Sequence, residues 1–241
     1  MRIDTQLTFY STKRSAWLGV YDDFMKAFWR NNSLSVVVLA LFGLFLLGQA
    51  FTGFAVNNQD LQEHGRAAIG FGAYLLSGHF MEAVFENWES EFLQMGAYVL
   101  LTVWLVQKGS AESKAPGKFE QVDAAPKRKR RAPWPVRRGG WVLKLYQNSL
   151  VIAMFGLFFM SFMLHGIGGT RAACDEQRLH GQPCESVIGY MTSSQFWFES
   201  FQNWQSEFLA VGSLIIFSIW LRQQGSPESK PVSASHVKTG E

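Results

Sequence analysis

The chain has 241 residues, of which 48% are hydrophobic and 17% are charged, with a formal net charge of +3 and two cysteines. This length accommodates one or two domains, and two cysteines are too few for a multi-cysteine metal cluster. The sequence shows no nucleotide-binding loop, nucleophile elbow or zinc-protease helix, so we expect no enzymatic activity, no cofactor and no bound metal.

The first 32 residues form a basic segment in which apolar side chains recur at helical spacing. This pattern predicts an amphipathic helix over residues 15–30, lying in the inner membrane interface or packed on a partner domain. Its apolar face consists of Trp17, Val20, Tyr21, Phe24 and Phe28. The first long apolar run starts too late for a cleavable signal peptide, so we expect this segment to remain in the cytoplasm.

Two long apolar runs predict transmembrane helices. Residues 33–56 and 149–169 contain no formally charged side chain. A spanning helix needs about 20 mostly apolar residues, and both runs meet that length. The alternative, a buried helix of a soluble protein, rarely lacks charge over such a distance.

A second feature of the chain is an acidic motif that occurs twice. The sequence FENWESEFL at residues 85–93 returns as FQNWQSEFL at residues 201–209, an offset of 116 residues. From position 85 to position 114, 16 of 30 residues match their partners, which indicates a duplicated unit.

Each motif leads into a shorter apolar run, residues 92–106 and residues 208–221. These runs predict the second and fourth spans. At 1.5 Å per residue each is shorter than the hydrocarbon core of about 30 Å. We therefore expect each helix to begin near Trp88 or Trp204, or earlier, with its glutamate at the outer membrane boundary.

Residues 67–81 and 186–198 are also apolar but too short to span a bilayer. Counting them as spans would move the basic linker outside the cell, against the bias of Lys and Arg for the cytoplasm. We interpret them as interfacial or re-entrant helices that lead into the motifs.

The basic residues predict the orientation. With both termini and the central linker in the cytoplasm, 19 of the 22 Lys and Arg residues lie on that side. The predicted fold is an all-α membrane protein with four transmembrane helices, arranged as two parallel two-span repeats. Its segments are a cytoplasmic N-terminal segment, a first membrane repeat, a basic disordered linker, a second membrane repeat and a flexible cytoplasmic tail, at 1–32, 33–109, 110–140, 141–225 and 226–241.

Both cysteines, Cys174 and Cys184, fall in the second outer loop. An oxidising compartment favours a disulfide there, and closing so short a loop stabilises the fold by slightly less than ~3 kcal/mol in the chain-entropy model. A metal site that includes His180 lacks the further ligands that a closed zinc site needs.

The linker carries a run of five consecutive basic residues. Its composition resembles a nucleic-acid-binding patch, but beside a membrane we prefer attraction to anionic lipid headgroups, with no nucleic acid bound. The run is Lys127, Arg128, Lys129, Arg130 and Arg131.

The motif residues are the candidate functional groups. Trp88 and Trp204 are suited to anchoring in the interface. The Asn and Ser residues can cap a helix start, and a Glu there is favoured by the helix dipole. Alternatively, repeated acids at a membrane boundary mark an ion or proton path. The pathway candidates are Glu91, Glu207, Asn87, Asn203, Ser90 and Ser206.

Two histidines have weaker signals. His165 aligns with Gln49 at the outer end of the first span of each repeat, and we interpret it as a hydrogen-bonded helix-end residue. His79 and Glu82 have an i, i+3 spacing that suits a metal, but the second copy does not repeat the pair.

The duplicated Asn-Trp-x-Ser-Glu-Phe-Leu motif, with its downstream Gly96 and Gly212 and its Trp104 and Trp220, resembles a family of uncharacterised bacterial membrane proteins known only as a domain of unknown function. The resemblance covers residues 30–110 and 146–230. It implies a location in the bacterial inner membrane and brings no established activity.

Two functions are compatible with these features. The first is a small cation or proton pathway that uses Glu91 and Glu207, which parallel repeats could bring around one axis. The second is a non-catalytic scaffold or accessory subunit of a membrane protein complex. Four helices enclose little volume, so we expect a homo-oligomer or a membrane-protein partner, with Gly43, Gly48 and Gly156 permitting close helix contacts.

Overall fold

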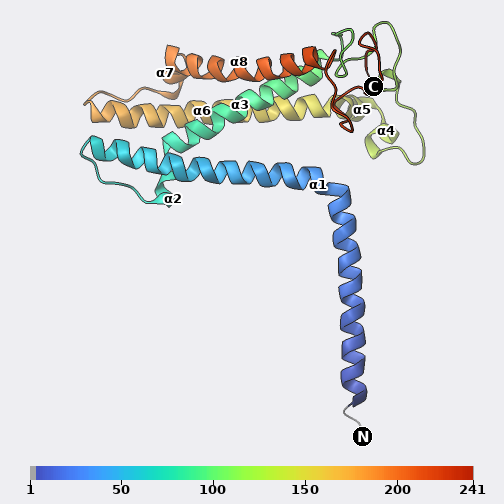
Figure 1. Ribbon diagram of the computed structural model, residues 1–241. Helices are drawn as coiled ribbons and strands as arrows, with labels where there is room; N and C mark the ends of the chain where they lie inside the picture. The colour runs from blue at the N-terminus through green and yellow to red at the C-terminus, as the bar shows by residue number, and fades with distance from the viewer. Residues whose placement is uncertain (1–3, 241) are drawn as a thin grey trace. The chain divides into compact units, whose positions relative to one another are not determined.

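The computed structural model describes the backbone of residues 4–240 and the side chains of residues 24–240 (Figure 1). Within these residues all regular structure is helical, so the all-α prediction is confirmed. The chain divides into two compact units, Met1–Ala68 and Ile69–Glu241. The division falls inside the predicted first repeat, because the second half of that repeat packs with the rest of the chain.

The first unit is one long helix, α1 (Asp4–Glu63). Its helical backbone continues through residue 32, where the sequence analysis placed a boundary, since no proline interrupts residues 4–63, although the helix bends sharply along its length (Figure 1). The helix ends before Gly65, whose φ of 70° suits glycine. Of the predicted amphipathic face, Phe24 and Phe28 are exposed, and the side chains of residues 17, 20 and 21 lie outside the described residues.

The second unit is built on α3 (Gly78–Leu101), which packs against both α6 (Ser149–Leu179) and α8 (Ser194–Phe217) (Figure 1). A short helix precedes each of the two repeated long helices: α2 (Phe71–Tyr74) before α3, and α7 (Val187–Met191) before α8. These short helices lie within the segments that the sequence analysis expected to lead into the motifs.

The duplication is visible in the local structure. Helices α3 and α8 start and end at positions that differ by 116 residues. Ser77 caps α3 by accepting from the backbone N–H of Phe80, and Ser193 caps α8 by accepting from Phe196. The same sequence pattern therefore produces the same helix start in both copies.

These caps correct the role that the sequence analysis gave to the motif. Asn87 and Ser90 lie inside α3, nine or more residues after its start at Gly78. Their side chains donate to backbone carbonyls of their own helix, Asn87 to Ala83 and Ser90 to Asn87. The helix starts earlier because a serine in an extended conformation, followed by residues without proline, already satisfies the first free N–H groups.

Two described helices are long and apolar enough to cross a membrane, judged by length and composition. They are residues 24–63 of α1 and the whole of α6, and they contain the predicted first and third spans. In both, most of the apolar window is not buried by other parts of the chain. The other two predicted spans, 92–106 and 208–221, lie only partly in α3 and α8, because these helices end at Leu101 and Phe217.

Close packing of α3 and α7 on α6 depends on glycines of α6. A Cβ on Gly168 would stand 2.6 Å from the backbone nitrogen of Glu82, and one on Gly169 would stand 2.4 Å from the Tyr190 ring. Such distances are shorter than any carbon contact, so both positions must lack a side chain. The glycines allow α3 and α7 to approach α6 beside His165.

The linker and tail have defined contacts where the sequence analysis expected disorder. The linker contains η1 (Gln121–Asp123), α4 (Trp134–Arg138) and α5 (Gly140–Gln147). The tail contacts the start of the linker. The Gly109 N–H donates to Thr239 Oγ1, and the Gly240 N–H donates to the Ser110 carbonyl. Lys230 is 1% exposed because its ammonium donates to backbone carbonyls that include those of Gly109 and Lys238. From the sequence alone, a lysine in a polar tail is expected to be exposed to water. Here the backbone carbonyls take the place of water around its ammonium group.

Candidate functional site

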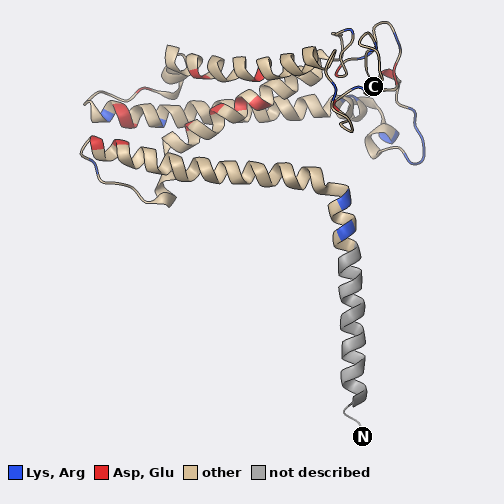
Figure 2. Cartoon of the chain, viewed as in Figure 1, with Lys and Arg blue, Asp and Glu red and all other residues tan. Residues whose placement is uncertain are grey.

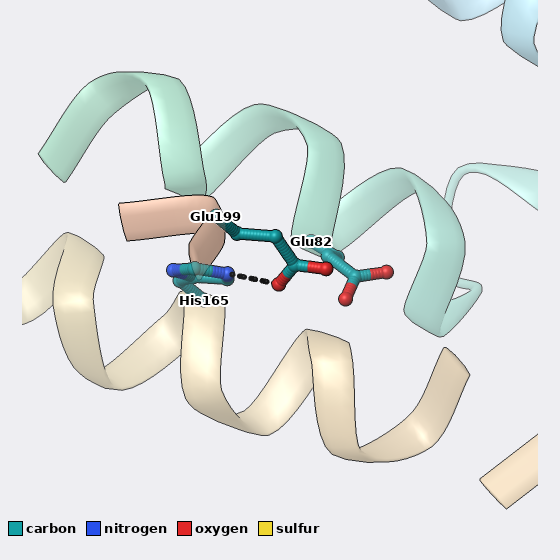
Figure 3. Close-up of side chains that lie close together, drawn as sticks. All are labelled: Glu82, His165 and Glu199. Carbon is teal, nitrogen blue, oxygen red and sulfur yellow. Dashed lines mark ion pairs between the residues drawn. The ribbon is translucent and has the colours of Figure 1, made fainter. Parts of the chain in front are cut away.

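A buried group of ionisable side chains lies where α3, α6 and α8 meet. His165 projects from α6 toward Glu82 of α3 and Glu199 of α8 (Figure 3). One ligand atom from each of the three lies within 4.8 Å of the others. The His165 side chain is 0% exposed, and its ring stacks on Phe196 with centroids 4.7 Å apart. The histidine is therefore fixed in one position by packing.

Glu89 holds the other side of the His165 ring. His165 Nδ1 donates to Glu89 Oε2 at 3.1 Å, and the Glu89 side chain is fully buried. The second oxygen of Glu89 accepts from Ser200 Oγ at 2.8 Å and from Trp204 Nε1 at 3.2 Å. With three neighbouring donors, the Glu89 side chain is fixed in position and orients the imidazole.

The opposite ring nitrogen faces the other carboxylates. His165 Nε2 lies 3.5 Å from Glu199 Oε2, and this buried nitrogen has no hydrogen-bond partner in residues 24–240. The Glu199 side chain keeps 19% of its exposure, so the group opens toward the surface at this point. The site is thus deep at Glu89 and accessible at Glu199.

Tyr190 of α7 joins the two outer carboxylates. Its hydroxyl lies 2.7 Å from Glu82 Oε1 and 2.9 Å from Glu199 Oε2. Burial and the two neighbouring carboxylates raise the pKa of Tyr190, so the phenol keeps its proton. The phenol can donate its one proton to only one of the two carboxyl groups at a time.

Acidic side chains outnumber basic ones in this group. Glu86 of α3 adds a fourth carboxylate, within electrostatic range of His165, Glu199 and Glu82. Among the described residues, the ion pairs of Glu89 and Glu199 involve His165 alone. Four carboxyl groups facing one imidazole in a partly buried site need compensation, either by bound protons or by additional positive charge.

Polar side chains continue from this group along α3. Glu82, Glu86, Ser90, Gln94 and Tyr98 follow one another at intervals of four residues, along a single row of the helix surface. Ser90 and Gln94 are buried. From Glu82 to Tyr98 this α3 polar row extends about 24 Å.

At the far end of the α3 polar row, Tyr98 donates to Glu112 Oε2 at 3.0 Å, and Glu112 lies within electrostatic range of Glu228. Glu112 and Glu228 are equivalent positions of the two repeats, so the row ends where the two copies meet.

The structure places the predicted pathway residues beside this group rather than in it. Glu91 is exposed and Glu207 is half-buried, and the two lie close enough for their charges to interact. Asn203 and Ser206 donate to carbonyls of α8, as their counterparts in α3 do. Whether these residues line a pathway stays a prediction.

The two predicted tryptophan anchors differ. The sequence analysis placed Trp204 at the lipid interface, but its indole N–H instead donates to the buried Glu89. A carboxyl group in a buried site is a stronger hydrogen-bond acceptor than water. Trp88 is half-buried and packs edge-to-face on Phe85. Only Trp204 belongs to the buried group.

The predicted disulfide is present, linking Cys174 at the end of α6 to Cys184 with Cα atoms 4.7 Å apart. The run of five basic residues, 127–131, is exposed throughout. Its side chains are available to a charged surface, as an interaction with lipid headgroups requires. Figure 2 shows basic residues along this linker and acidic residues along α3 and α8.

Sequence reasoning missed the buried group because it followed what the two copies share. Glu82, Glu89, His165 and Glu199 align with Phe198, Gln205, Gln49 and Ala83 in the other copy. A signal was nevertheless present: positions 82, 86 and 89 have the i, i+4, i+7 spacing that places three glutamates on one helix face. His79, which the sequence paired with Glu82, contacts Tyr74 instead.

A model of one protein family matches residues 25–241 of the chain. Its description is a domain of unknown function, DUF6766. Neither the curated proteins nor the solved structures include a match.

Proposed function

Since the chain belongs to the DUF6766 family of unknown function, we propose from its geometry that it is a non-enzymatic, multi-pass membrane protein that passes a cation. The observation that carries this proposal is the buried, negatively charged group of Glu82, Glu89, Glu199 and His165. Ionisable residues inside membrane helices are costly and commonly mark ion paths.

The path runs along α3. The α3 polar row continues from the buried group to Tyr98, and its length of about 24 Å approaches the hydrocarbon thickness of about 30 Å. Glu91 and Glu207 add negative charge beside the row and complete the predicted pathway with Asn87, Asn203, Ser90 and Ser206. A cation would therefore find oxygen ligands over most of the membrane depth.

The proposed topology has four spans, in α1, α3, α6 and α8, with the two repeats parallel. Three observations support it. Lys and Arg gather on the side of both termini and the linker. The disulfide lies at the opposite end of α6, which suits an oxidising outer face. Equivalent acids of the two copies meet, as Glu112 and Glu228 do. The proposed location is the bacterial inner membrane, with both termini cytoplasmic.

Flux into liposomes tests the pathway. We expect the purified protein to pass at least one of H⁺, Na⁺, K⁺ or a divalent cation, and Glu199→Gln to slow that flux at least about tenfold through loss of a charged ligand. Glu185→Gln, an exposed acid in the α6–α7 connection, is the matched control and should leave flux unchanged. The double variant Glu91→Gln/Glu207→Gln shows whether the repeated acids lie on the path. Absence of cation flux from folded protein would refute the proposal.

One observation favours a second function. The apolar residues of α1 from 34 to 56 are largely exposed, and Gly43, Gly48 and Gly156 have no other side chain or backbone within 4 Å of a built Cβ. Such surfaces suit helix–helix contacts in a membrane, so the protein could act as a scaffold or accessory subunit, or assemble with itself. A stable heteromeric partner after mild extraction, together with no flux, would favour this role.

A further inference from the structure

The site between α3, α6 and α8 has the composition of a metal centre. We propose that Glu82, His165 and Glu199 bind a divalent first-row transition-metal ion through two carboxylates and the Nε2 atom of the imidazole. This inference rests on the proposed function in taking the site as a cation site, and it names the class of cation.

The first argument is the free nitrogen. His165 Nε2 is buried, points between the two carboxylates and has no hydrogen-bond partner within residues 24–240. A buried polar atom without a partner is rare and costly. Because Nδ1 is engaged by Glu89, Nε2 is the ring nitrogen left to bind a metal, in exchange for any proton that it carries.

The second argument is the arrangement behind the ring. Metal-binding histidines commonly donate their second ring N–H to a carboxylate, which fixes the tautomer and the ring orientation. Glu89 does this at 3.1 Å, and Ser200 and Trp204 in turn fix Glu89. Glu89 is therefore a positioning residue that acts through His165.

The third argument is distance. Two ligands bound to one zinc-like ion at about 2.0–2.2 Å lie about 3.0–3.5 Å apart. His165 Nε2 and Glu199 Oε2 are 3.5 Å apart, and an oxygen of Glu82 lies within 4.8 Å of both. A small rotation of the half-buried Glu82 side chain would complete three protein ligands and leave further positions for water or the Tyr190 oxygen.

The ligand set also selects the class of metal. Calcium and magnesium prefer oxygen ligands alone. One imidazole with two carboxylates suits Mn²⁺, Fe²⁺, Co²⁺ or Zn²⁺. A divalent ion would moreover supply the positive charge that the four carboxylates need.

Binding of Co²⁺ and Zn²⁺ to the full-length chain, purified in detergent with any affinity tag removed, tests the site. We expect one ion per chain and a Co²⁺ visible absorption band, with no displacement by excess Mg²⁺. Glu199→Gln and His165→Gln should weaken binding at least about 100-fold. Glu89→Gln should weaken it about 10–100-fold and shift the Co²⁺ band, because the ring loses its orienting partner. A shift of the band distinguishes positioning from a general loss of stability.

The matched control is Glu185→Gln, an exposed carboxylate in the α6–α7 connection, which should bind Co²⁺ as the wild type does. If His165→Gln does not fold, Glu199→Gln remains decisive because that side chain is partly exposed. Absence of stoichiometric binding, or binding that Glu199→Gln leaves intact, would overturn the site. Metal binding without cation flux would refute the proposed function alone, and flux of other cations without metal binding would refute this inference alone.

Discussion

Glu89 is completely buried, and each of its oxygens has an assigned donor. Removing a carboxylate from water is costly unless hydrogen bonds replace its hydration. Here Ser200 and Trp204 share one oxygen while His165 takes the other. The three donors come from α6 and α8, whereas the acceptor comes from α3. The carboxylate therefore ties three helices together as well as orienting the histidine.

Loss of the Ser200 hydroxyl tests this role. Ser200→Ala removes one donor from a buried carboxylate, and hydrogen bonds to charged groups contribute about 1.5–3 kcal/mol. We expect a lower midpoint of thermal unfolding in detergent. Ser206→Ala is the control, because this exposed hydroxyl of the same helix donates only to its own backbone. Equal midpoints for the two variants would show that Ser200 contributes nothing special to stability.

The duplication drew the sequence analysis away from the residues of the buried group. Reasoning from repeated residues selected Asn, Ser and Glu91 with Glu207, all of which recur in both copies. The buried group instead uses positions where the copies differ, such as Glu89 against Gln205. Residues that recur in both copies support the helix structure that the copies share. The buried group, in contrast, is built from residues that occur in one copy only. Only the three-dimensional contact of α3 with α6 and α8 brings these single-copy residues together.

At the scale of elements, α6 is shaped by its small residues. Gly168 lets the backbone of α3 approach, and Gly169 receives the ring of Tyr190. Both contacts adjoin His165, so the spacing of α3 and α7 from α6 sets the separation between the histidine and its neighbouring carboxylates. The packing of these helices therefore also determines the geometry of the site.

Glycine-to-alanine substitutions in α6 should lower the free energy of unfolding at some positions and raise it at others. Gly168→Ala and Gly169→Ala place a methyl group against Glu82 or Tyr190 and should destabilise the fold by about 1–3 kcal/mol through overpacking. Gly156→Ala meets nothing within 4 Å and should stabilise the helix by up to about 1 kcal/mol. Unfolding in detergent measures both. A stabilised Gly168→Ala would show that α3 lies farther from α6 than described here.

Much of the helical architecture was readable from the sequence. The apolar runs predicted the two helices long enough to span, and the 116-residue offset predicted a matching pair, which α3 and α8 form. The helix starts were misplaced because the Asn and Ser of the motif have good capping side chains, while Ser77 and Ser193 lie in less distinctive sequence. The contacts of the tail could not be predicted from the sequence because they are long-range, such as that of Lys230 with Gly109.

At the scale of the whole molecule, charge and redox chemistry point to the same orientation. In sequence, the basic run 127–131 precedes α6, whereas the disulfide lies near the C-terminal end of α6. Moving the basic run across a membrane is unfavourable, and disulfides persist in oxidising compartments. The two signals are independent because one depends on translocation and the other on the thiol chemistry of the outer face.

Labelling of single added cysteines with a membrane-impermeant maleimide tests this orientation. In cells that express the protein, Ala125→Cys in the linker should react only after permeabilisation. Arg66→Cys, between α1 and α2, should react in intact cells because it lies in the first predicted outer connection. Both positions are exposed, so any difference reports the side of the membrane rather than burial. The native cysteines are joined to each other and add no background. Reaction of Ala125→Cys in intact cells would show that the topology is the reverse of the one proposed. The Tyr98 end of the α3 polar row would then face outward.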